Sequence, residues 1–438
     1  MESKIINRPQ SFNLKKFNRR GINKNFLIFL VILFAVSVFR DVYSLAFGEE
    51  SFDRDSNSVR IAIFQDLDEF DISVRGEYKI LDAVNKRILD EGWVLRDRKV
   101  KIRAEQTNGI RIGLKNYPVN KLTIAPTFDA TVYINQRRFS GAVNIIRTAD
   151  QKLLLVNVVG LEAYIKGVLY HEVSHRWPMD ALKSQAVAAR SYAIYRMQNS
   201  ADKDFDVTND IYSQVYGGKT SERYRTNLAV EWTKNQVLTY AGKILPAYFH
   251  ATCAGHTENV SELWKQDILP LKGVFCPYCK NSPHYNWKQN FRLKDIQDKL
   301  NAAGYKIGLI QDIRIVERNR SNRIRKLLIT DRQGESLAIS GKDFRNLVGP
   351  NLIRSNNYDI EMKGYFFDMN GHGWGHGVGL CQWGADEMAR QHYKYDEILN
   401  FYYPAAKIEM INDHMDWNKN KIFSKKILPN LTEPLELH

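Results

Sequence analysis

HEVSHRWPMDALKSQAVAARSYA, at His171–Ala193, is the stretch that decides the fold. The apolar residues just before it recur at helical spacing and form one stripe: Leu161, Tyr164, Ile165, Val168 and Leu169. Pro178 then opens a second helix, which we expect to run to about Gln198. Its packing face is made of small and apolar side chains, namely Leu182, Ala186, Ala189 and Ala193. The sequence therefore predicts two consecutive helices with Glu172 at the turn between them.

Short β-like runs surround this helical motif. Those before Gly160 are separated by polar turns and lie at Arg60–Phe64, Val100–Ala104, Arg111–Leu114, Ala130–Ile134 and Leu153–Val158. We expect one helix, near Ile80–Asp90, to interrupt them. Further along come a strand-rich segment at Ile313–Ile339, a glycine-rich loop at Gly371–Gly379 and a last helix near Ala385–His392. The pattern predicts an α+β fold of mixed sheets, with a substrate groove between the helical motif and the glycine-rich loop.

The N-terminus combines a basic stretch, residues 1–25, with the apolar run Phe26–Phe39. This run is short for a membrane span and suits the core of a signal peptide. Residues 26–46 are therefore expected to be either a cleaved signal peptide or an uncleaved membrane anchor, and both alternatives place the rest of the chain outside the cytoplasm, in the cell envelope. Residues 47–58 would be a linker, 59–408 one folded domain and 409–438 a polar tail.

The net charge is +14, and part of it lies in the leader. The remaining basic residues are spread along the chain, without an arginine-rich tract or zinc-finger spacing, so nucleic acid is not an expected partner. A mildly basic exported protein suits an anionic polymer such as the cell wall, or a membrane surface.

Glu172 is the candidate catalytic residue. A carboxyl group at the junction of two helices, flanked by Tyr170 and Trp177, can be partly removed from water. Desolvation raises the pKa of a carboxyl and keeps it protonated near neutral pH, as a general acid requires. Lys183 and Arg190 are seven residues apart on the second helix, hence on one face, and could hold an anionic or hydroxyl-rich substrate. The alternative is a surface glutamate with solvated basic neighbours.

HEVSH also matches the zinc-protease motif, with His171 and His175 four residues apart and Glu172 beside the first. That motif needs an uninterrupted helix. Trp177-Pro178 follows two residues later and ends any helix, so this alternative is a minor one.

A cysteine–histidine cluster lies further along the chain. Cys253 and His256 precede Cys276-Pro277-Tyr278-Cys279. These residues have the ligand types and number for a structural zinc ion. Disulfides compete in an exported protein, because three cysteines leave one over that could pair with Cys381, and free thiols are a third alternative.

Longer motifs carry a resemblance to a known family. They comprise Leu161–Val168, then Glu172, Trp177-Pro178, Ala181–Tyr192, Asp210–Gly218 and Gly375–Ala385. In this order they resemble the SpoIID/LytB family, and the similarity spans roughly Val59 to Tyr403. Many relatives have Ser-Gly-Gly where this chain has Cys253-Ala254-Gly255, so the resemblance does not imply a metal site.

The resemblance implies an exported peptidoglycan lytic transglycosylase, which cleaves the bond between N-acetylmuramic acid and N-acetylglucosamine and leaves a 1,6-anhydro sugar. Glu172 occupies the position of the family's acid/base. No cofactor is required for this reaction. Peptide-stripped glycan is the preferred substrate, so an N-acetylmuramoyl-L-alanine amidase is an expected partner. The rival interpretation is a non-catalytic amidase enhancer or wall-binding protein.

Four further residues are substrate-binding candidates. Gln214 and Tyr216 lie in a motif of the family, and an amide and a phenol suit sugar hydroxyls and ring faces. His376 lies in the glycine-rich loop, where the backbone can approach a ligand closely, and Gln382 follows that loop. For Tyr216 and His376 a purely structural role is the alternative.

Overall fold

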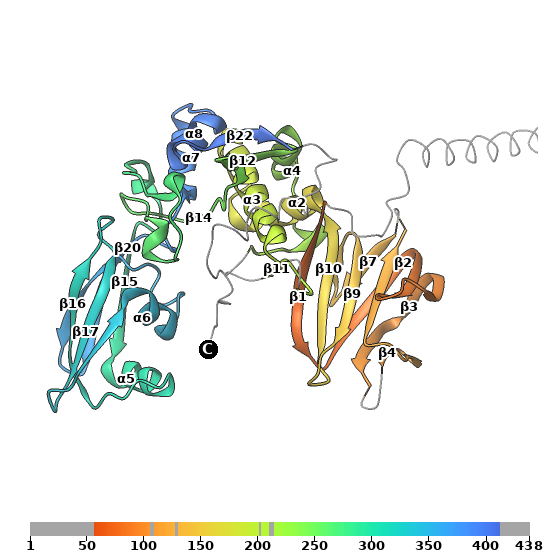
Figure 1. Cartoon of the computed structure of the whole chain (residues 1–438), viewed down its shortest axis with the longest axis horizontal. Coiled ribbons are helices and arrows are strands. Elements are labelled where there is room, and N and C mark those ends of the chain that lie inside the picture. The colour runs from red at the N-terminus through yellow and green to blue at the C-terminus, as the bar shows by residue number, and fades with distance from the viewer. Residues whose placement is uncertain (1–56, 106–108, 128–129, 201–202, 210–213, 412–438) are drawn as a thin grey trace, which may run out of the picture. The chain divides into compact units, whose positions relative to one another are not determined.

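A computed structural model describes residues 57–105, 109–127, 130–200, 203–209 and 214–411 (Figure 1). The predicted leader, the signal peptide or anchor, most of the linker and nearly all of the polar tail lie outside these residues. Within the described ranges, no helix combines the length and the apolar character needed to cross a membrane.

The N-terminal part is one large twisted sheet of mostly antiparallel strands. Its principal order is β11-β1-β10-β9-β6-β2-β3-β4-β5, and β7 pairs with both β2 and β8. The strands are β1 (Ser58–Leu67), β2 (Glu69–Asp82), β3 (Ile88–Ala104), β4 (Ile110–Ile112), β5 (Lys115–Tyr117), β6 (Lys121–Pro126), β7 (Thr131–Ile134), β8 (Arg137–Phe139), β9 (Ala142–Arg147), β10 (Leu153–Gly160) and β11 (Val207–Thr208). Branched apolar side chains from alternate positions fill its core.

The helix expected near Ile80–Asp90 is absent, and that prediction was wrong. The segment is instead the turn of a hairpin in which Leu81 of β2 pairs with Ile88 of β3. Burial of Tyr78 and Ile80 follows the period of two that a strand requires. Lys86 has a φ of 60°, which the tight reversal between the two strands needs.

Helices pack beside this sheet and extend the same hydrophobic core. They are α2 (Leu161–Glu172), α3 (Met179–Gln198), α4 (Tyr224–Trp232), α7 (Gln382–Arg390) and α8 (Tyr395–Tyr402). Small sheets join them: β12 (Gln236–Tyr240) lies between β13 (Lys243–Ile244) and β22 (Lys407–Met410), and β14 (Phe249–His250) pairs with β21 (Leu380–Cys381). Figure 1 shows these helices gathered around α3. The two helices predicted on either side of Glu172 are α2 and α3.

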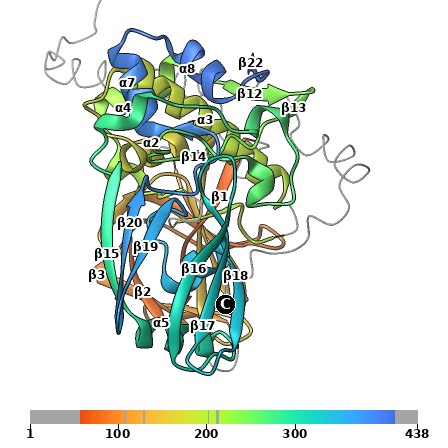
Figure 2. The same cartoon turned by 90° about the vertical axis from the view of Figure 1, so that its left-hand side faces the viewer.

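A second hydrophobic core lies between Trp287 and Met369. It is built from β15 (Asn286–Arg292), β19 (Tyr358–Lys363) and β20 (Phe366–His372) in one sheet and from β16 (Ile310–Arg318), β17 (Ile324–Asp331) and β18 (Ser336–Ser340) in another. The helices of this core are α5 (Leu293–Ala302) and α6 (Gly341–Val348). Figure 2 looks onto these strands.

The chain enters and leaves this second core at one place. Asn286 of β15 pairs with His372 of β20, and the Gly373 N–H donates to the Tyr285 carbonyl at 2.9 Å. Helices and several mixed and antiparallel sheets thus coexist, which confirms the predicted α+β class.

Candidate active site

Glu172 is the last residue of α2, and the local sequence explains why the helix ends there. The backbone of Val173 is extended, at φ −140° and ψ 151°, while its N–H still bonds the Leu169 carbonyl. The Trp177 N–H closes a turn onto the Ser174 carbonyl at 3.0 Å, and α3 starts after Pro178. The carboxyl is therefore carried on a short, hydrogen-bonded connection between two packed helices, as the sequence predicted.

Gln382 is the partner of this carboxyl. It is the first residue of α7, and its Nε2 lies 3.4 Å from Oε2 of Glu172. The preceding strand β21 runs parallel to β14, with His250 opposite Cys381, and this pairing sets where α7 begins. The structure thus brings the helical motif and the segment after the glycine-rich loop into contact, at two residues that were both predicted as site residues.

The environment of Glu172 favours a protonated carboxyl. Burial raises its pKa from 4.5 to about 7, although the Gln382 side chain and the Val215 N–H oppose the change by bonding the charged form. The residue keeps partial contact with solvent. Within the described part of the chain it forms no ion pair, so no fixed cation holds it ionised. Such a carboxyl can both give and take a proton near neutral pH.

Aromatic side chains lie close in sequence to Glu172 and to its partner Gln382. Trp177 and Trp383 meet edge to face with ring centroids 5.3 Å apart. The ring centroid of His284 lies 6.2 Å from that of Trp383 and 4.5 Å from that of Trp374. The guanidinium of Arg354 lies over the Trp374 ring. Trp383, His284 and Trp374 are partly exposed. These three residues were not predicted as site candidates, although Trp383 lies inside the motif Gly375–Ala385.

Arg190 does not line a groove, so its prediction as a substrate ligand is corrected. Its side chain is fully buried and bonds both carboxylate oxygens of Glu162, at 2.8 and 2.7 Å. It also donates to the carbonyls of Val230 and Gln236. Lys183 is different: it is partly exposed, and its ammonium lies over the rings of Trp232 and Tyr395.

Gln214 and Tyr216 are also interior residues. Gln214 accepts a hydrogen bond from the Tyr164 hydroxyl at 2.9 Å and is 1% exposed. Tyr216 is 2% exposed, and its hydroxyl donates to Asn157 at 2.9 Å. Their hydrogen-bonding groups are thus directed at the protein. In place of sugar contacts, these two side chains connect the segment before η1 (Gly218–Ser221) to the core beneath α2.

His376 is partly exposed and lies among Tyr248, His250 and Trp264. Its Nδ1 accepts the Val378 N–H at 3.0 Å, which fixes the tautomer with the proton on Nε2. Burial lowers its pKa to about 3, so the ring is neutral at physiological pH. The Phe249 backbone forms a second hydrogen bond with the ring, so both ring nitrogens are engaged within the protein and the ring does not act as an acid.

The zinc-protease alternative is not supported by the geometry. Because α2 ends at Glu172, His175 lies beyond the helix that carries His171. The Nε2 of His171 instead bonds the Ser221 hydroxyl at 2.6 Å. The pair therefore lacks the helical arrangement that the motif requires.

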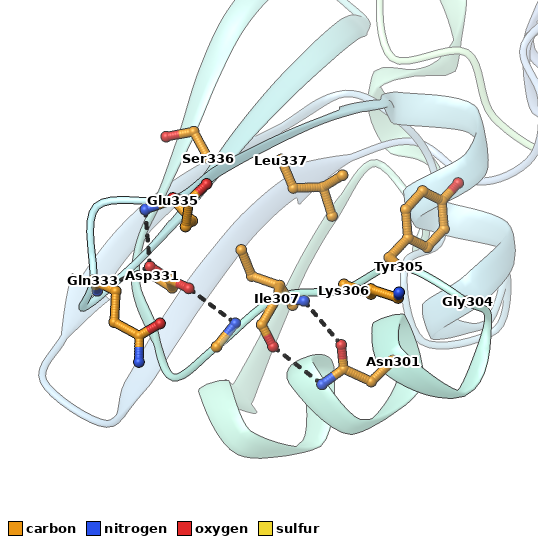
Figure 3. Close-up of a pocket in the computed structure, with 11 residues that line it drawn as sticks. Asn301, Gly304, Tyr305, Lys306, Ile307, Asp331, Gln333, Glu335, Ser336 and Leu337 are labelled. Carbon is orange, nitrogen blue, oxygen red and sulfur yellow. Dashed lines mark hydrogen bonds between the residues drawn. The ribbon is translucent and has the colours of Figure 1, made fainter.

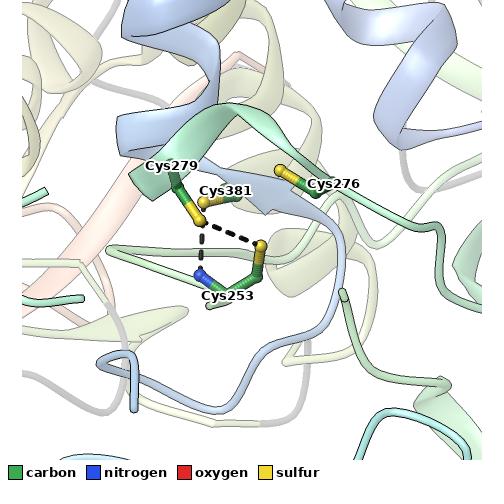
Figure 4. Close-up of side chains that lie close together, drawn as sticks. All are labelled: Cys253, Cys276, Cys279 and Cys381. Atoms are coloured by element: carbon green, nitrogen blue, oxygen red, sulfur yellow. Dashed lines mark hydrogen bonds between the residues drawn. The ribbon is translucent and has the colours of Figure 1, made fainter. Parts of the chain in front are cut away.

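The cluster in the structure differs in one residue from the predicted set of metal ligands. Cys253, Cys276 and Cys279 come together as predicted, but the fourth member is Cys381 and not His256 (Figure 4). The Nδ1 of His256 instead bonds the Thr257 carbonyl at 2.6 Å. All four cysteines are buried and none forms a disulfide.

A hollow of about 600 Å³ lies elsewhere, between the end of α5 and the turn joining β17 to β18 (Figure 3). Its polar groups are engaged with the surrounding loop: Asn301 bonds the backbone of Ile307, and Asp331 accepts from the Gly308 N–H. It contains none of the predicted site residues, and we do not connect it with the chemistry at Glu172.

Fold and site together define an α+β protein with one protonatable carboxyl at a helix turn, beside partly exposed aromatic rings. A family model described as Stage II sporulation protein matches residues 149–240, which include Glu172. A second, described as a domain of unknown function (DUF8618), matches residues 267–379, which contain the second core. The chain belongs to the SpoIID/LytB family.

Three relatives illustrate the similarity. An uncharacterized protein of Brachyspira hyodysenteriae is 32% identical over 380 residues, which cover 85% of this chain and 97% of that protein. Stage II sporulation protein D of Bacillus amyloliquefaciens is 31% identical, over 61% of this chain and 78% of its own. The amidase enhancer of Bacillus subtilis is 25% identical, over 56% of this chain and 40% of its own.

Proposed function

We propose that this protein acts on the cell wall as a peptidoglycan lytic transglycosylase, with Glu172 as its acid/base. Membership of the SpoIID/LytB family supports the cell-wall role. The observation that carries the catalytic proposal is the environment of one side chain: Glu172 has a pKa of about 7, has no cationic partner in the described residues and bonds only neutral donors. The protein would work in the cell envelope, outside the cytoplasm.

The chemistry follows from that protonation state. Protonated Glu172 gives its proton to the oxygen that joins C1 of N-acetylmuramic acid to N-acetylglucosamine, and the C1–O bond breaks. The muramoyl C6 hydroxyl oxygen attacks C1 and forms the 1,6-anhydro ring. Its proton passes to the Glu172 carboxylate, which restores the acid. No water is consumed, so the two products together have the mass of the substrate.

A single carboxyl suffices for this reaction, whereas ordinary glycosidases use two. Two other acids near the motifs are already engaged. Asp180 accepts the Tyr395 N–H at 3.3 Å, and Glu258 is 2% exposed and accepts from the Ser321 hydroxyl at 2.9 Å. Among the described residues, neither of these two acids is therefore a candidate for a second catalytic carboxyl.

The aromatic neighbours of Glu172 suit a glycan substrate. Sugar rings have apolar faces that pack against indole rings, and the partly exposed Trp383 follows directly on Gln382, which contacts the carboxyl. Lys183 adds a positive charge on the outward side of α3. Arg190, Gln214 and Tyr216 have no part in this proposal, because their polar groups are bonded within the protein.

The test is product analysis on amidase-treated sacculi. Wild-type protein is expected to release 1,6-anhydro disaccharides, detected by mass spectrometry, and Glu172→Gln is expected to release at least a hundredfold less, because general acid–base catalysis contributes about 10²–10⁴-fold. Glu91→Gln, the same change on an exposed residue, is the matched control. Equal product from wild type and Glu172→Gln would refute the catalytic role.

The second candidate is a non-catalytic amidase enhancer, favoured by the similarity to the protein of that name. It predicts faster release of stem peptides by an added amidase, without any anhydro sugar. In that case Glu172→Gln would enhance the amidase as well as wild type does. Scoring peptide release and anhydro products in one digestion separates the two functions.

A further inference from the structure

We propose that Cys253, Cys276, Cys279 and Cys381 form a zinc site of four thiolates, and that this site fixes the start of α7 beside Glu172. The four Sγ atoms all lie within 4.8 Å of one another. In a tetrahedral site with Zn–S bonds of about 2.3 Å, sulfur atoms are about 3.8 Å apart. The Sγ atoms of Cys253 and Cys279 are 3.5 Å apart, close to that value.

Mutual proximity of all four atoms is what distinguishes zinc from two disulfides. Disulfides need two close pairs, and nothing draws one pair toward the other. A tetrahedral ion requires all six separations to be short, and they are. The four thiols are each at most 1% exposed. Figure 4 shows them gathered from separate segments of the chain.

The surroundings suit a site with a net negative charge. The Cys253 N–H donates to the Cys381 sulfur at 3.3 Å, and the Tyr402 hydroxyl lies 3.2 Å from the Cys276 sulfur. Hydrogen bonds of this kind stabilise metal-bound thiolates. The buried guanidinium of Arg323 donates to the Cys253 carbonyl at 3.0 Å and places a positive charge next to the cluster.

The site lies where three segments meet that are also joined by the pairing of β14 with β21 and by the Cys276 N–H bond to the Gly255 carbonyl at 2.9 Å. Cys253 follows β14, the CxxC pair Cys276 and Cys279 frames the start of η4 (Tyr278–Asn281), and Cys381 ends β21. Cys381 is also the residue before Gln382, whose amide bonds Glu172. A zinc ion would therefore hold the first residue of α7 in place. This positioning role rests on the proposed function, whereas zinc binding itself does not.

The binding test measures metal content and intact mass on the full chain purified without added chelator. We expect about one zinc ion per chain, and four thiols that react with a thiol reagent only after the metal is removed. Cobalt(II) exchanged into the site should give the visible absorption of tetrahedral thiolate coordination. Metal-free protein four hydrogens lighter than the reduced chain would show two disulfides and overturn the proposal, as would iron in place of zinc.

The zinc content of single variants distinguishes residues that bind the metal from residues that only lie beside the cluster. Cys279→Ser should lower the zinc content at least tenfold, whereas His256→Ala, beside the cluster but bonded to backbone, should keep it. Should the cysteine variant not fold, controlled removal and restoration of zinc on wild-type protein gives the same comparison. Retention of full zinc by a folded Cys279→Ser would refute the ligand assignment.

The proposed role of zinc in positioning Gln382 is tested by measuring glycan cleavage with and without the metal. Removal of zinc should weaken glycan cleavage and shift its pH profile, because Gln382 no longer bonds the Glu172 carboxylate, and restored zinc should reverse both changes. Zinc bound without any glycan cleavage would refute the proposed function and leave the metal site standing. Cleavage and pH profile unchanged in zinc-free, folded protein would refute the positioning role alone.

Discussion

Replacing Glu172 by glutamine should make the protein more stable, by an amount that grows as pH rises from 4.5 and is complete above about pH 7. The carboxyl has a pKa of about 7 in the folded state against 4.5 for the free group. That difference corresponds to about 3 kcal/mol of folding free energy lost once the group is ionised. Because the residue keeps some contact with water, we expect about 2–3 kcal/mol.

The sign of this stability change follows from the direction in which the pKa of Glu172 is shifted. A raised carboxyl pKa means that the folded chain binds the proton more tightly than the unfolded chain does. Well below pH 4.5 both states are protonated and Glu172 costs nothing; between pH 4.5 and about 7 only the unfolded state ionises, so the cost grows over this range and is complete above it. Glutamine never ionises, so Glu172→Gln avoids this cost. It can still bond the Gln382 side chain and the Val215 N–H.

The assay is urea unfolding of wild type, Glu172→Gln and the exposed control Glu91→Gln between pH 4 and pH 8.5. The free energy of unfolding of Glu172→Gln should match wild type at pH 4 and exceed it by about 2–3 kcal/mol at pH 8.5, whereas the control should follow wild type throughout. A stability difference independent of pH, or no difference at pH 8.5, would refute the reasoning that burial holds the proton on this carboxyl.

Three further predictions follow from the site. Gln382→Ala removes a donor to the Glu172 carboxylate, so the alkaline limb of the pH–rate profile should move up by roughly half a pH unit; an unmoved limb would show that the amide does not act on the carboxyl. Trp383→Ala should raise KM for peptide-stripped glycan about tenfold and change kcat much less; a loss confined to kcat would contradict the stacking role. Arg190→Lys loses the paired bonds to Glu162 and should lower the free energy of unfolding by about 3 kcal/mol; glycan binding by the folded variant, measured by co-sedimentation with sacculi, should be unchanged.

The helical hairpin around Glu172 could be predicted because its signals are local. The apolar stripe that ends at Leu169 and the proline at position 178 fix where α2 stops and α3 starts, and these bounds agree with the structure. The same locality explains the error near Ile80–Asp90. A short apolar segment has too few residues to distinguish a helix from a strand, and pairing with β3 and β6 decides the outcome.

The site beyond Glu172 depends on contacts that spacing does not encode. Seven-residue spacing places Lys183 and Arg190 on one face of α3. It does not indicate whether that face meets solvent. Buried Ala186, Val187 and Ala188 show that α3 is covered on several sides. Alanines on more than one face were the available signal. Likewise, Cys381 reaches the cysteine cluster through the pairing of β14 with β21, which the sequence alone does not reveal.

The way the second core is connected has a consequence for the effect of changes within it. Its chain departs after Tyr285 and rejoins at Gly373, and a single hydrogen-bonded rung spans the two ends. Glu172, Gln382 and the four cysteines all lie outside this excursion, whereas Arg323 and Ser321 within it bond Cys253 and Glu258 outside it. Changes in the second core that keep Arg323 and Ser321 would therefore leave the bonds to Cys253 and Glu258 unaltered.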